Sequence, residues 1–225
     1  PVSLQFVLGY AFIAILLLVL VIAARRRWAD SKEAFMPEGR FNLRSFFEAM
    51  VEGALGLMGS MMDRKAALYF VPLIGTCAFF ILFSNLIGLV PGFLPPTSNL
   101  NTTLAMAAVI FVTTHIYGVK EHGFIKYFAH WMGPIRKWWA LPLMLLMFAI
   151  EIVSHIARPV SLSVRLMGNM AADHMVVGTF IGLVPILVPL PIMILGVMVC
   201  IVQTLVFCIL STVYIGMAVA HEEHE

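Results

Sequence analysis

RPVSLSVRLMGNM, residues 158–170, places Arg158 and Arg165 inside an apolar stretch that begins near residue 141 and continues past residue 180. About 20 apolar residues suffice for a helix to cross the hydrocarbon core of a bilayer. This stretch exceeds that length, which predicts a helix that is strongly tilted or projects beyond the bilayer. A charge at mid-bilayer costs about 2.5–3.5 kcal/mol, so both arginines are expected to face water or a partner charge.

The composition of the chain extends this interpretation to its whole length. Of the 225 residues, 61% are hydrophobic and 12% are charged, and the mean hydropathy is +0.98. No soluble core of this size could bury so much apolar surface, so we predict an all-α polytopic membrane protein with a single membrane domain over residues 1–225. Cys77, Cys200 and Cys208 are spaced unlike metal or redox motifs and are interpreted as packing residues. The first residue is Pro1 and not Met, so some N-terminal sequence is expected to be missing. No signal-peptide cleavage pattern is seen.

Apolar and interfacial segments divide the chain into predicted elements. About five transmembrane helices are predicted, over residues 4–24, 66–90, 102–119, 141–181 and 185–220. Residues 41–62 carry apolar side chains at helical spacing with Glu48 and Glu52 on the other side, which predicts an amphipathic helix at the interface or against other helices. Residues 124–139 combine tryptophans with lysine and arginine, a combination typical of the membrane interface.

Basic residues predict which way the helices face. Twelve of the 14 lysines and arginines fall in residues 25–44, 64–65 and 120–137, which lie on one side when five spans are threaded in order. The opposite loops, 91–101 and 182–190, contain none. The positive-inside rule then puts the N-terminus outside and the C-terminus in the cytoplasm.

The fourth predicted span has a polar face. At about 100° per residue, Arg158 lies within about 20° of Arg165, and two further polar residues lie within about 40°. Together they predict one polar stripe made of Glu151, Arg158, Arg165 and Asn169. His155 and Asp173 fall about 80° away on a flank, and His174 falls about 180° away.

Each charge in this span has a local alternative to a functional role. Arg158 could lie near the end of the hydrocarbon or pair with Glu151. Arg165 could pair with Asp173 of the same chain. Arg stays protonated where a buried Lys loses its proton, so a site that must remain positive in a dry environment needs Arg. Such a site would hold an ionised carboxylate and release it when a proton arrives. Gln203 in the fifth span either packs against the polar stripe or bonds nearby backbone.

The run from Glu151 through Arg165 to Met170 resembles subunit a of the F-type ATP synthases. The resemblance includes the five-span layout, Asn-Leu-Ile-Gly-Leu-Val-Pro at 85–91, Thr-Leu-Ala-Met-Ala at 103–107 and the region of the fifth-span glutamine, so it covers nearly the whole chain. It implies a stator subunit that is not itself an enzyme. Two aqueous half-channels would open to opposite sides of the membrane. A rotating c-ring, with one carboxylate per c subunit, would turn against the long tilted fourth and fifth spans.

The resemblance also implies roles for single residues. Arg165 would be the essential stator charge, which attracts the ionised ring carboxylate and blocks direct proton flow between the half-channels. Asn169, Gln203 and Glu151 match polar or acidic positions of the family and are assigned to proton translocation. Arg158 matches a basic position and is assigned a supporting electrostatic role. His155 is assigned a supporting relay role on other grounds, because it flanks the charged stripe.

The chain departs from the commonest bacterial pattern next to the arginine. Many members have Glu nine residues after the arginine and His seven residues before the glutamine, where this chain has His174 and Gly196. Asp173 occupies a place often held by Gly. Our hypothesis is that Asp173 and His174 together supply the titratable groups of the outer half-channel, because an unperturbed His pKa of about 6.5 suits proton exchange near neutrality. The alternative for His155 and His174 is a structural hydrogen bond inside the protein.

Three other classes of function agree less well with the sequence. A membrane electron carrier would hold haem between His115, His155 and His174, but the last two lie on one span and the arginine motif stays unexplained. A stand-alone secondary transporter would use Arg165 as a site for a substrate anion, but no internal repeat supports it. An intramembrane protease is not supported, since the sequence has no His-Glu-x-x-His.

Partners and location follow from the same resemblance. No Gly-rich phosphate loop is found, so nucleotide chemistry is expected in other subunits, and no cofactor, metal ion or nucleic acid is expected. The expected partners are the c-ring, subunit b of the peripheral stalk, other synthase subunits and the lipid bilayer, with protons rather than sodium as the transported ion. The expected location is the bacterial inner membrane, with the mitochondrial or thylakoid membrane as the alternative.

Overall fold

The computed structural model describes residues 2–30, 43–90, 93–124, 126–127, 141–183 and 189–219. Regular secondary structure in this part is entirely helical. The elements are α1 (Val2–Asp30), α2 (Leu43–Gly59), α3 (Arg64–Gly88), the short 3₁₀ helix η1 (Pro96–Ser98), α4 (Leu100–His122), α6 (Leu141–Leu183) and α7 (Pro189–Val219). Several of these helices are long and apolar enough to cross a membrane, which confirms the predicted class, an all-α polytopic membrane protein.

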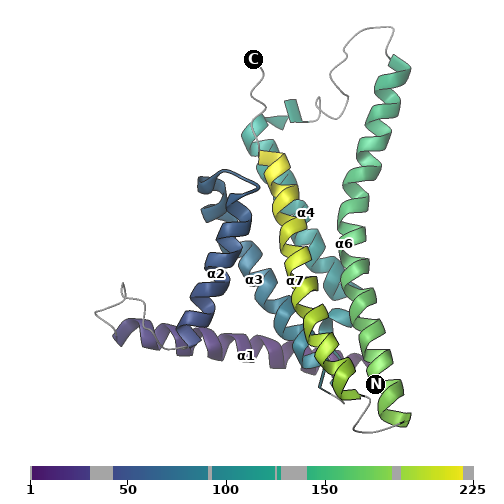
Figure 1. The fold of residues 1–225 in the computed structure, drawn as a ribbon. Helices are drawn as coiled ribbons and strands as arrows, with labels where there is room; N and C mark the ends of the chain where they lie inside the picture. The colour runs from purple at the N-terminus through teal and green to yellow at the C-terminus, as the bar shows by residue number, and fades with distance from the viewer. Residues whose placement is uncertain are drawn as a thin grey trace.

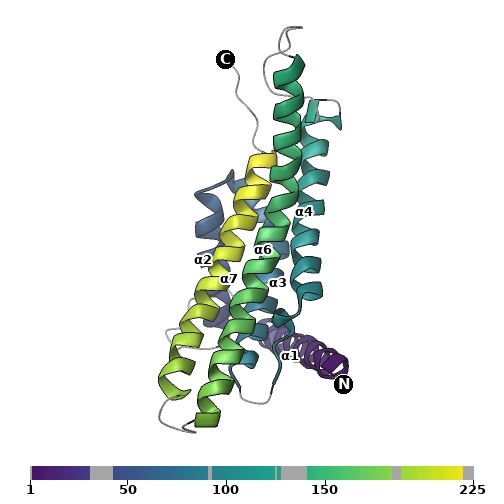
Figure 2. The same ribbon diagram turned by 90° about the vertical axis from the view of Figure 1, so that its right-hand side faces the viewer.

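Four helices of the described part are long and apolar enough to cross a membrane, namely α3, α4, α6 and α7. They lie side by side in both views of the ribbon (Figures 1 and 2). The closest packing joins α4 to α6, α3 to α7 and α4 to α7. These helices cover the stretches in which the second to fifth spans are predicted, and α6 continues through Pro159 without interruption.

The first helix differs from the others in direction. In Figure 1, α1 lies across one end of the bundle instead of running alongside it. The hydroxyls of Tyr10 and Thr102 are hydrogen-bonded, which ties α1 to the start of α4. The ring centroid of Phe12 lies 6.3 Å from that of Phe93, just before η1. The span predicted over 4–24 is therefore helical but is not threaded beside the other four, because hydropathy reports the length of an apolar segment and not its direction.

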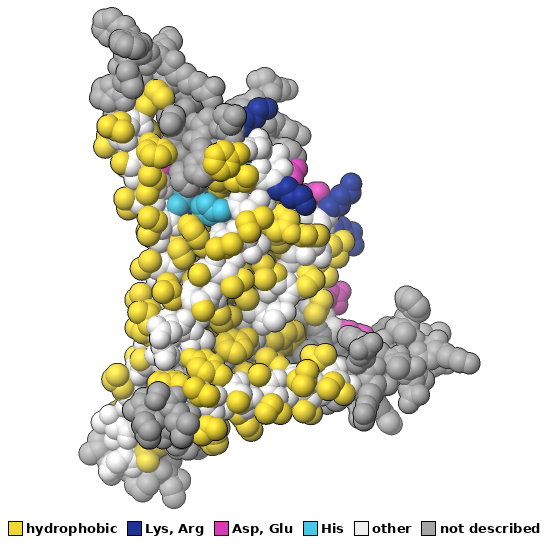
Figure 3. Space-filling model, turned by 180° about the vertical axis from the view of Figure 1, so that it is seen from behind, with side chains coloured by type: hydrophobic (Ala, Val, Ile, Leu, Met, Phe, Trp, Pro, Cys, Tyr) yellow, Lys and Arg dark blue, Asp and Glu magenta, His cyan; other side chains and the backbone are white. Residues whose placement is uncertain are grey.

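Antiparallel helices create two distinct ends of the bundle. The end where α3 begins and α4 finishes is here named the basic end, since it contains Arg64, Lys65 and Lys120. Figure 3 shows Lys and Arg side chains gathered toward one end of a face that is otherwise mostly apolar. The opposite end is named the η1 end. Of the predicted interfacial segment, 124–139, most lies outside the described residues, including Trp131, Trp138 and Trp139.

The predicted amphipathic segment, 41–62, contains α2, which packs against α3 and α7. Met58 of α2 is buried with Ile74 and Ile215. Glu48 and Glu52 are exposed on the other side of the helix. Of the two settings expected for this segment, packing against other helices is the one that the structure describes.

The centre of the bundle is an apolar core with polar groups bonded inside their own helices. Its buried residues are Cys77, Ile81, Ala107, Ile110, Leu162, Leu166 and Phe207. The hydroxyls of Thr114, Thr204 and Thr212 each donate to the carbonyl four residues earlier, at 2.8 Å. Local bonding of this kind lets hydroxyls lie between membrane helices, where an unsatisfied polar group costs several kcal/mol. One side of α6 packs against this core, and its other side is exposed.

Candidate functional site

The open sides of α6 and α7 carry an apolar surface. On the inner side of α6, Leu162, Leu166 and Met170 are nearly fully buried. The large apolar side chains exposed on the two helices include Val153, Ile156, Val160, Val164, Met175 and Val176 of α6, and Ile194, Leu195, Met198, Ile201, Val202 and Leu205 of α7. Small residues that let another helix approach closely are exposed between them on α6, namely Ala157, Ser161, Ala172 and Gly178. This surface, which we name the α6–α7 face, suits contact with other transmembrane helices or lipid.

Arg165 is exposed on α6 among these apolar residues. No carboxylate in the described part of the chain lies within ion-pair distance of its guanidinium. The local alternative, a pair between Arg165 and Asp173, is therefore not formed. A permanent charge on a membrane helix is left to face water or a group from another molecule.

One helical turn after Arg165, a polar bridge joins α6 to α7. Asn169 donates from Nδ2 to Oε1 of Gln203, with the two atoms 2.8 Å apart. The Gln203 side chain is buried, whereas Asn169 is exposed. Of the two expectations for the glutamine, packing against the polar residues of the fourth span is the one observed. The bridge fixes α7 beside the arginine.

The rest of the predicted polar stripe is divided between different partners. The Arg158 guanidinium lies 5.3 Å from the ring centroid of Tyr214 on α7. Glu151 Oε1 lies 3.3 Å from His155 Nε2. His155 is one turn from Glu151, about 6 Å along the axis, whereas Arg158 is two turns away at about 10 Å. Helical angles alone could not reveal this division, because they ignore both rise and side-chain direction.

Asp173 and His174 line one small cavity at the η1 end of the bundle. The other lining residues are Asn85, Gly88, Leu89, Pro95, Met170 and Val177. Oδ2 of Asp173 and Nδ2 of Asn85 are both buried without a hydrogen-bond partner in the described structure. The Thr97 hydroxyl donates to Oδ1 of Asn85 at 2.6 Å, which fixes the amide. About 10 Å³ remains for the centre of a water molecule, close to the smallest space that holds one.

Asn85 is a polar residue of this cavity that was not predicted to belong to the site. It stands at the start of the 85–91 motif, and an Asn in an apolar span is a signal that could have found it. Its position beside Asp173 also depends on η1, which no helical pattern predicts. Gly196, at the position where the resemblance suggests His, is buried, and a Cβ there would lie 2.5 Å from Leu89 Cδ2. Leu89 thus fills the space beside Gly196.

Comparison with known proteins shows what the chain is similar to. The family described as ATP synthase A chain matches residues 7–216. ATP synthase subunit a of Sorangium cellulosum is 45% identical over 212 residues, which cover 94% of this chain and 81% of the relative. The subunit a of Geobacter sulfurreducens is 47% identical over 206 residues, covering 92% and 83%. That of Geotalea uraniireducens is 49% identical over 173 residues, covering 77% and 72%.

Proposed function

The chain belongs to the ATP synthase A chain family, and we propose that it is the proton-translocating stator subunit of an F-type ATP synthase. Two aqueous half-channels lead protons to and from the carboxylates of a rotating c-ring. The chain contributes the membrane part of the path, and nucleotide chemistry takes place in other subunits. Protons, rather than sodium ions, are the transported ion.

The exposed charge of Arg165 carries this proposal. It lies on an apolar membrane helix, on the α6–α7 face, and no described carboxylate of the same chain compensates it. A guanidinium stays protonated at any physiological pH. A charge of this kind is expensive in hydrocarbon, at about 2.5–3.5 kcal/mol, unless a partner charge or water reaches it. A carboxylate on a passing helix of the c-ring supplies that partner.

The same charge explains directional transfer. A ring carboxylate is attracted to Arg165 while it is ionised and is released when a proton neutralises it. Protons are repelled from the guanidinium, so Arg165 separates the two half-channels. Each elementary charge that crosses 100 mV contributes about 2.3 kcal/mol, so several protons are needed for one ATP.

We assign proton entry to the cavity that Asp173 and His174 line at the η1 end. Support comes from two buried polar atoms of opposite character, Asp173 Oδ2 and Asn85 Nδ2, which border the same small space. The bridge between Asn169 and Gln203 lies one turn from the arginine, on the side of this cavity. Arg158 supports the path electrostatically.

Partners and placement follow from the same proposal. The α6–α7 face contacts the c-ring, while the remaining surface contacts lipid, subunit b of the peripheral stalk and other subunits. We assign the basic end to the cytoplasm by the positive-inside rule and the N-terminus to the outside; because α1, with Arg25 to Arg27, lies across the η1 end, the rule rests here on Arg64, Lys65 and Lys120. Bacterial relatives and four apolar helices support a bacterial membrane protein, and we propose the inner membrane.

The test replaces Arg165 with Ala in the assembled complex in sealed vesicles. Proton-driven ATP synthesis and passive proton leak are measured on the same preparation. We expect synthesis to be lost with the complex intact and the leak to rise, because the barrier between the half-channels is removed. Normal coupled synthesis in Arg165→Ala would refute the proposed function and leave Arg165 as a structural charge.

A further inference from the structure

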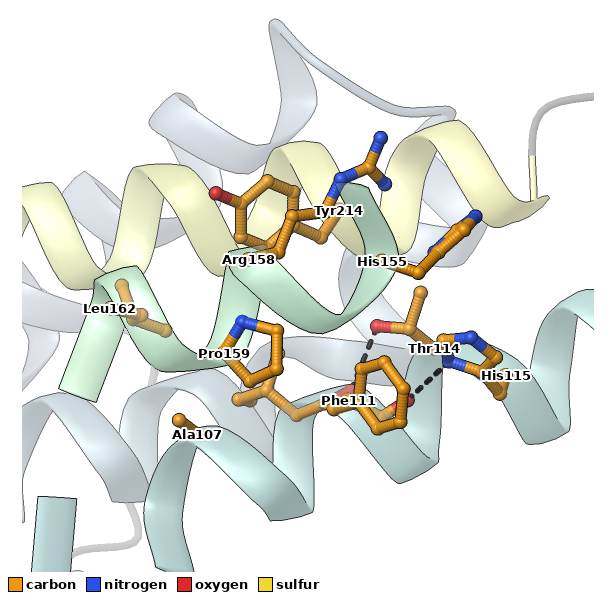
Figure 4. Close-up of a pocket in the computed structure, with 10 residues that line it drawn as sticks. Ala107, Phe111, Thr114, His115, His155, Arg158, Pro159, Leu162 and Tyr214 are labelled. Carbon is orange, nitrogen blue, oxygen red and sulfur yellow. Dashed lines mark hydrogen bonds between the residues drawn. The ribbon is translucent and has the colours of Figure 1, made fainter. Parts of the chain in front are cut away.

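A second cluster of titratable side chains lies toward the basic end, where α4, α6 and α7 meet. The rings of His115 and His155 contact each other between α4 and α6, with centroids 5.1 Å apart and planes at 70°. Figure 4 shows the two imidazoles together at one edge of a cavity between these helices. The proposed function gives His115 no role.

Hydrogen bonds determine which ring nitrogens can take up a proton. Nδ1 of His115 lies 2.8 Å from the Phe111 carbonyl oxygen, so Nδ1–H donates and Nε2 is the basic nitrogen. Nε2 of His155 lies 3.3 Å from Glu151 Oε1, so Nε2–H is directed at the carboxylate and Nδ1 is the basic nitrogen. Each ring therefore has one N–H held by an acceptor and one nitrogen that can gain and lose a proton.

The pair is surrounded by charged and titratable groups from three directions. On α6, Arg158 and Glu151 flank it, and on α7 the ring of Tyr214 lies against the Arg158 guanidinium. The ring of Tyr127, which follows α4, has its centroid 6.0 Å from that of His115. The Glu151 side chain is 39% exposed, so it connects the pair to the surface.

Space for water adjoins the two rings. The cavity leaves about 20 Å³ for the centres of water molecules, above the roughly 10–15 Å³ that one water requires. Arg158 and both histidines border it. In Figure 4, Arg158 and the two histidines lie toward the same side of this cavity, while Leu162 and Ala107 lie at the other. A water there has polar neighbours on the side of the rings.

The position of the pair along α6 assigns it to one half of the proton path. At about 1.5 Å per residue, His155 lies about 15 Å from Arg165 along the axis, in the direction of the basic end. The cavity lined by Asp173 lies on the other side of Arg165, at the η1 end. The histidine pair is therefore on the side of Arg165 where protons leave, if the basic end is cytoplasmic.

We propose that His115 and His155, together with Glu151, form the proton-release relay of the inner half-channel; this inference rests on the proposed function. A proton from the ring carboxylate binds the basic nitrogen of one imidazole, moves to the other ring, and leaves through Glu151 to cytoplasmic water. At each transfer the donor's bond to the proton, an O–H or an N–H bond, breaks as the acceptor's bond forms, and both rings end neutral. His155 takes up a proton at Nδ1 and gives one up from Nε2, so it ends as the other tautomer and returns to the first by proton exchange with water in the adjoining cavity. Two imidazolium charges with ring centroids 5.1 Å apart beside Arg158 would repel each other, so the pair carries only one additional proton at a time.

The test measures proton-driven ATP synthesis by the assembled complex in sealed vesicles while the pH of the cytoplasmic side is varied. The variants are His115→Gln, His155→Gln and the double variant, since glutamine keeps polarity but cannot carry the proton. The matched control is His122→Gln. His122 lies near the end of α4, the helix that contains His115, and does not line the cavity. The range covers about one unit on either side of the ordinary His pKa of about 6.5.

The relay predicts that each single variant slows synthesis about 100-fold or more, as loss of a positioned proton-transfer group does. The change of rate around pH 6.5 should disappear in both, and the double variant should be no slower than either, because both rings serve one pathway. The His122→Gln control should retain the wild-type rate and pH profile. If one variant does not assemble, the other decides, since the relay needs both rings.

Wild-type rates and pH profiles in the histidine variants would overturn the relay. Arg165→Ala, measured beside them, separates this outcome from failure of the proposed function. Loss of synthesis in Arg165→Ala with unchanged histidine variants overturns only the relay. Retained synthesis in Arg165→Ala overturns the function on which the relay depends.

Discussion

Arg158 and Arg165 lie on one helix, seven residues apart, yet their charges have different surroundings. Arg158 lies against the aromatic face of Tyr214, 5.3 Å from the ring centroid, and a cation in this position is stabilised within the chain. Arg165 is exposed and has no described ion-pair partner. The difference supports a structural and electrostatic role for the first and a role toward another subunit for the second.

The proposed entry site gives a prediction at the scale of single residues. In the Asp173→Asn, His174→Ala double variant, proton uptake at neutral pH should fall about 100-fold or more, because both proton-accepting groups of the cavity are removed. A fluorescent pH indicator, outside vesicles that contain the complex, reports this rate. Thr179→Val is the control. Thr179 is exposed on the same helix, α6, and its hydroxyl donates to the Met175 carbonyl of that helix. Unchanged uptake in the double variant would exclude these residues from the entry path.

The sequence was most informative about single elements and least informative about contacts between them. Hydropathy and the arginine motif predict the helices that became α3, α4, α6 and α7, because apolar length is encoded locally. The motif also singled out Arg165 and Asn169, and Gln203 stood out as a polar residue in the apolar fifth span. The partner of Glu151 and the position of Asn85 depend on rotamers and on the fold of η1. Neither leaves a periodic signal in the sequence.

The segment that leads into η1 packs closely on the end of α3, where Gly88 faces Pro95. A Cβ on Gly88 would lie 2.5 Å from Cβ and 2.7 Å from Cγ of Pro95, whose ring cannot turn away. Gly88→Ala should therefore cost about 1–3 kcal/mol of stability, as overpacking does. In Gly75→Ala, on the same helix, the added Cβ meets nothing within 4 Å, and the helix should gain up to about 1 kcal/mol.

Thermal unfolding of the purified complex measures both variants of α3. Gly88→Ala should melt below the wild type and Gly75→Ala at or above it. The reverse order would mean that η1 does not pack on Gly88 as described, and the boundary of the Asp173 cavity would then need revision.

At the scale of the whole molecule, the proposed orientation predicts which surfaces are reached from each side. Ser60, exposed where α2 meets α3, lies at the basic end, and Asn101, exposed at the start of α4, lies at the η1 end. In Ser60→Cys, a membrane-impermeant maleimide should label only from the cytoplasmic side. In Asn101→Cys, it should label only from outside. Cys77 and Cys200 are buried, and Cys208 is half-buried, so the unsubstituted protein gives the background.

If Ser60→Cys were labelled only from outside and Asn101→Cys only from the cytoplasm, the orientation of the protein would be the opposite of the one proposed. The basic end would then face outward, and the entry and release assignments of the two cavities would be exchanged. Labelling of Ser60→Cys from both sides would mean that the α2–α3 turn is not confined to one face of the membrane.

The proposed partner of Arg165 is a carboxylate on a helix of the c-ring. Ser161 and Ala172 are exposed, and their spacing of four and seven residues from Arg165 puts them on its side of α6. Ser161→Cys or Ala172→Cys is combined with a cysteine next to the ring carboxylate, and disulfide formation is measured after mild oxidation. Val112→Cys, on α4 and 51% exposed, is the control. Cross-links at residues 161 and 172 but not 112 are the predicted result. Their absence at both α6 positions, or equal cross-linking at 112, would contradict the account.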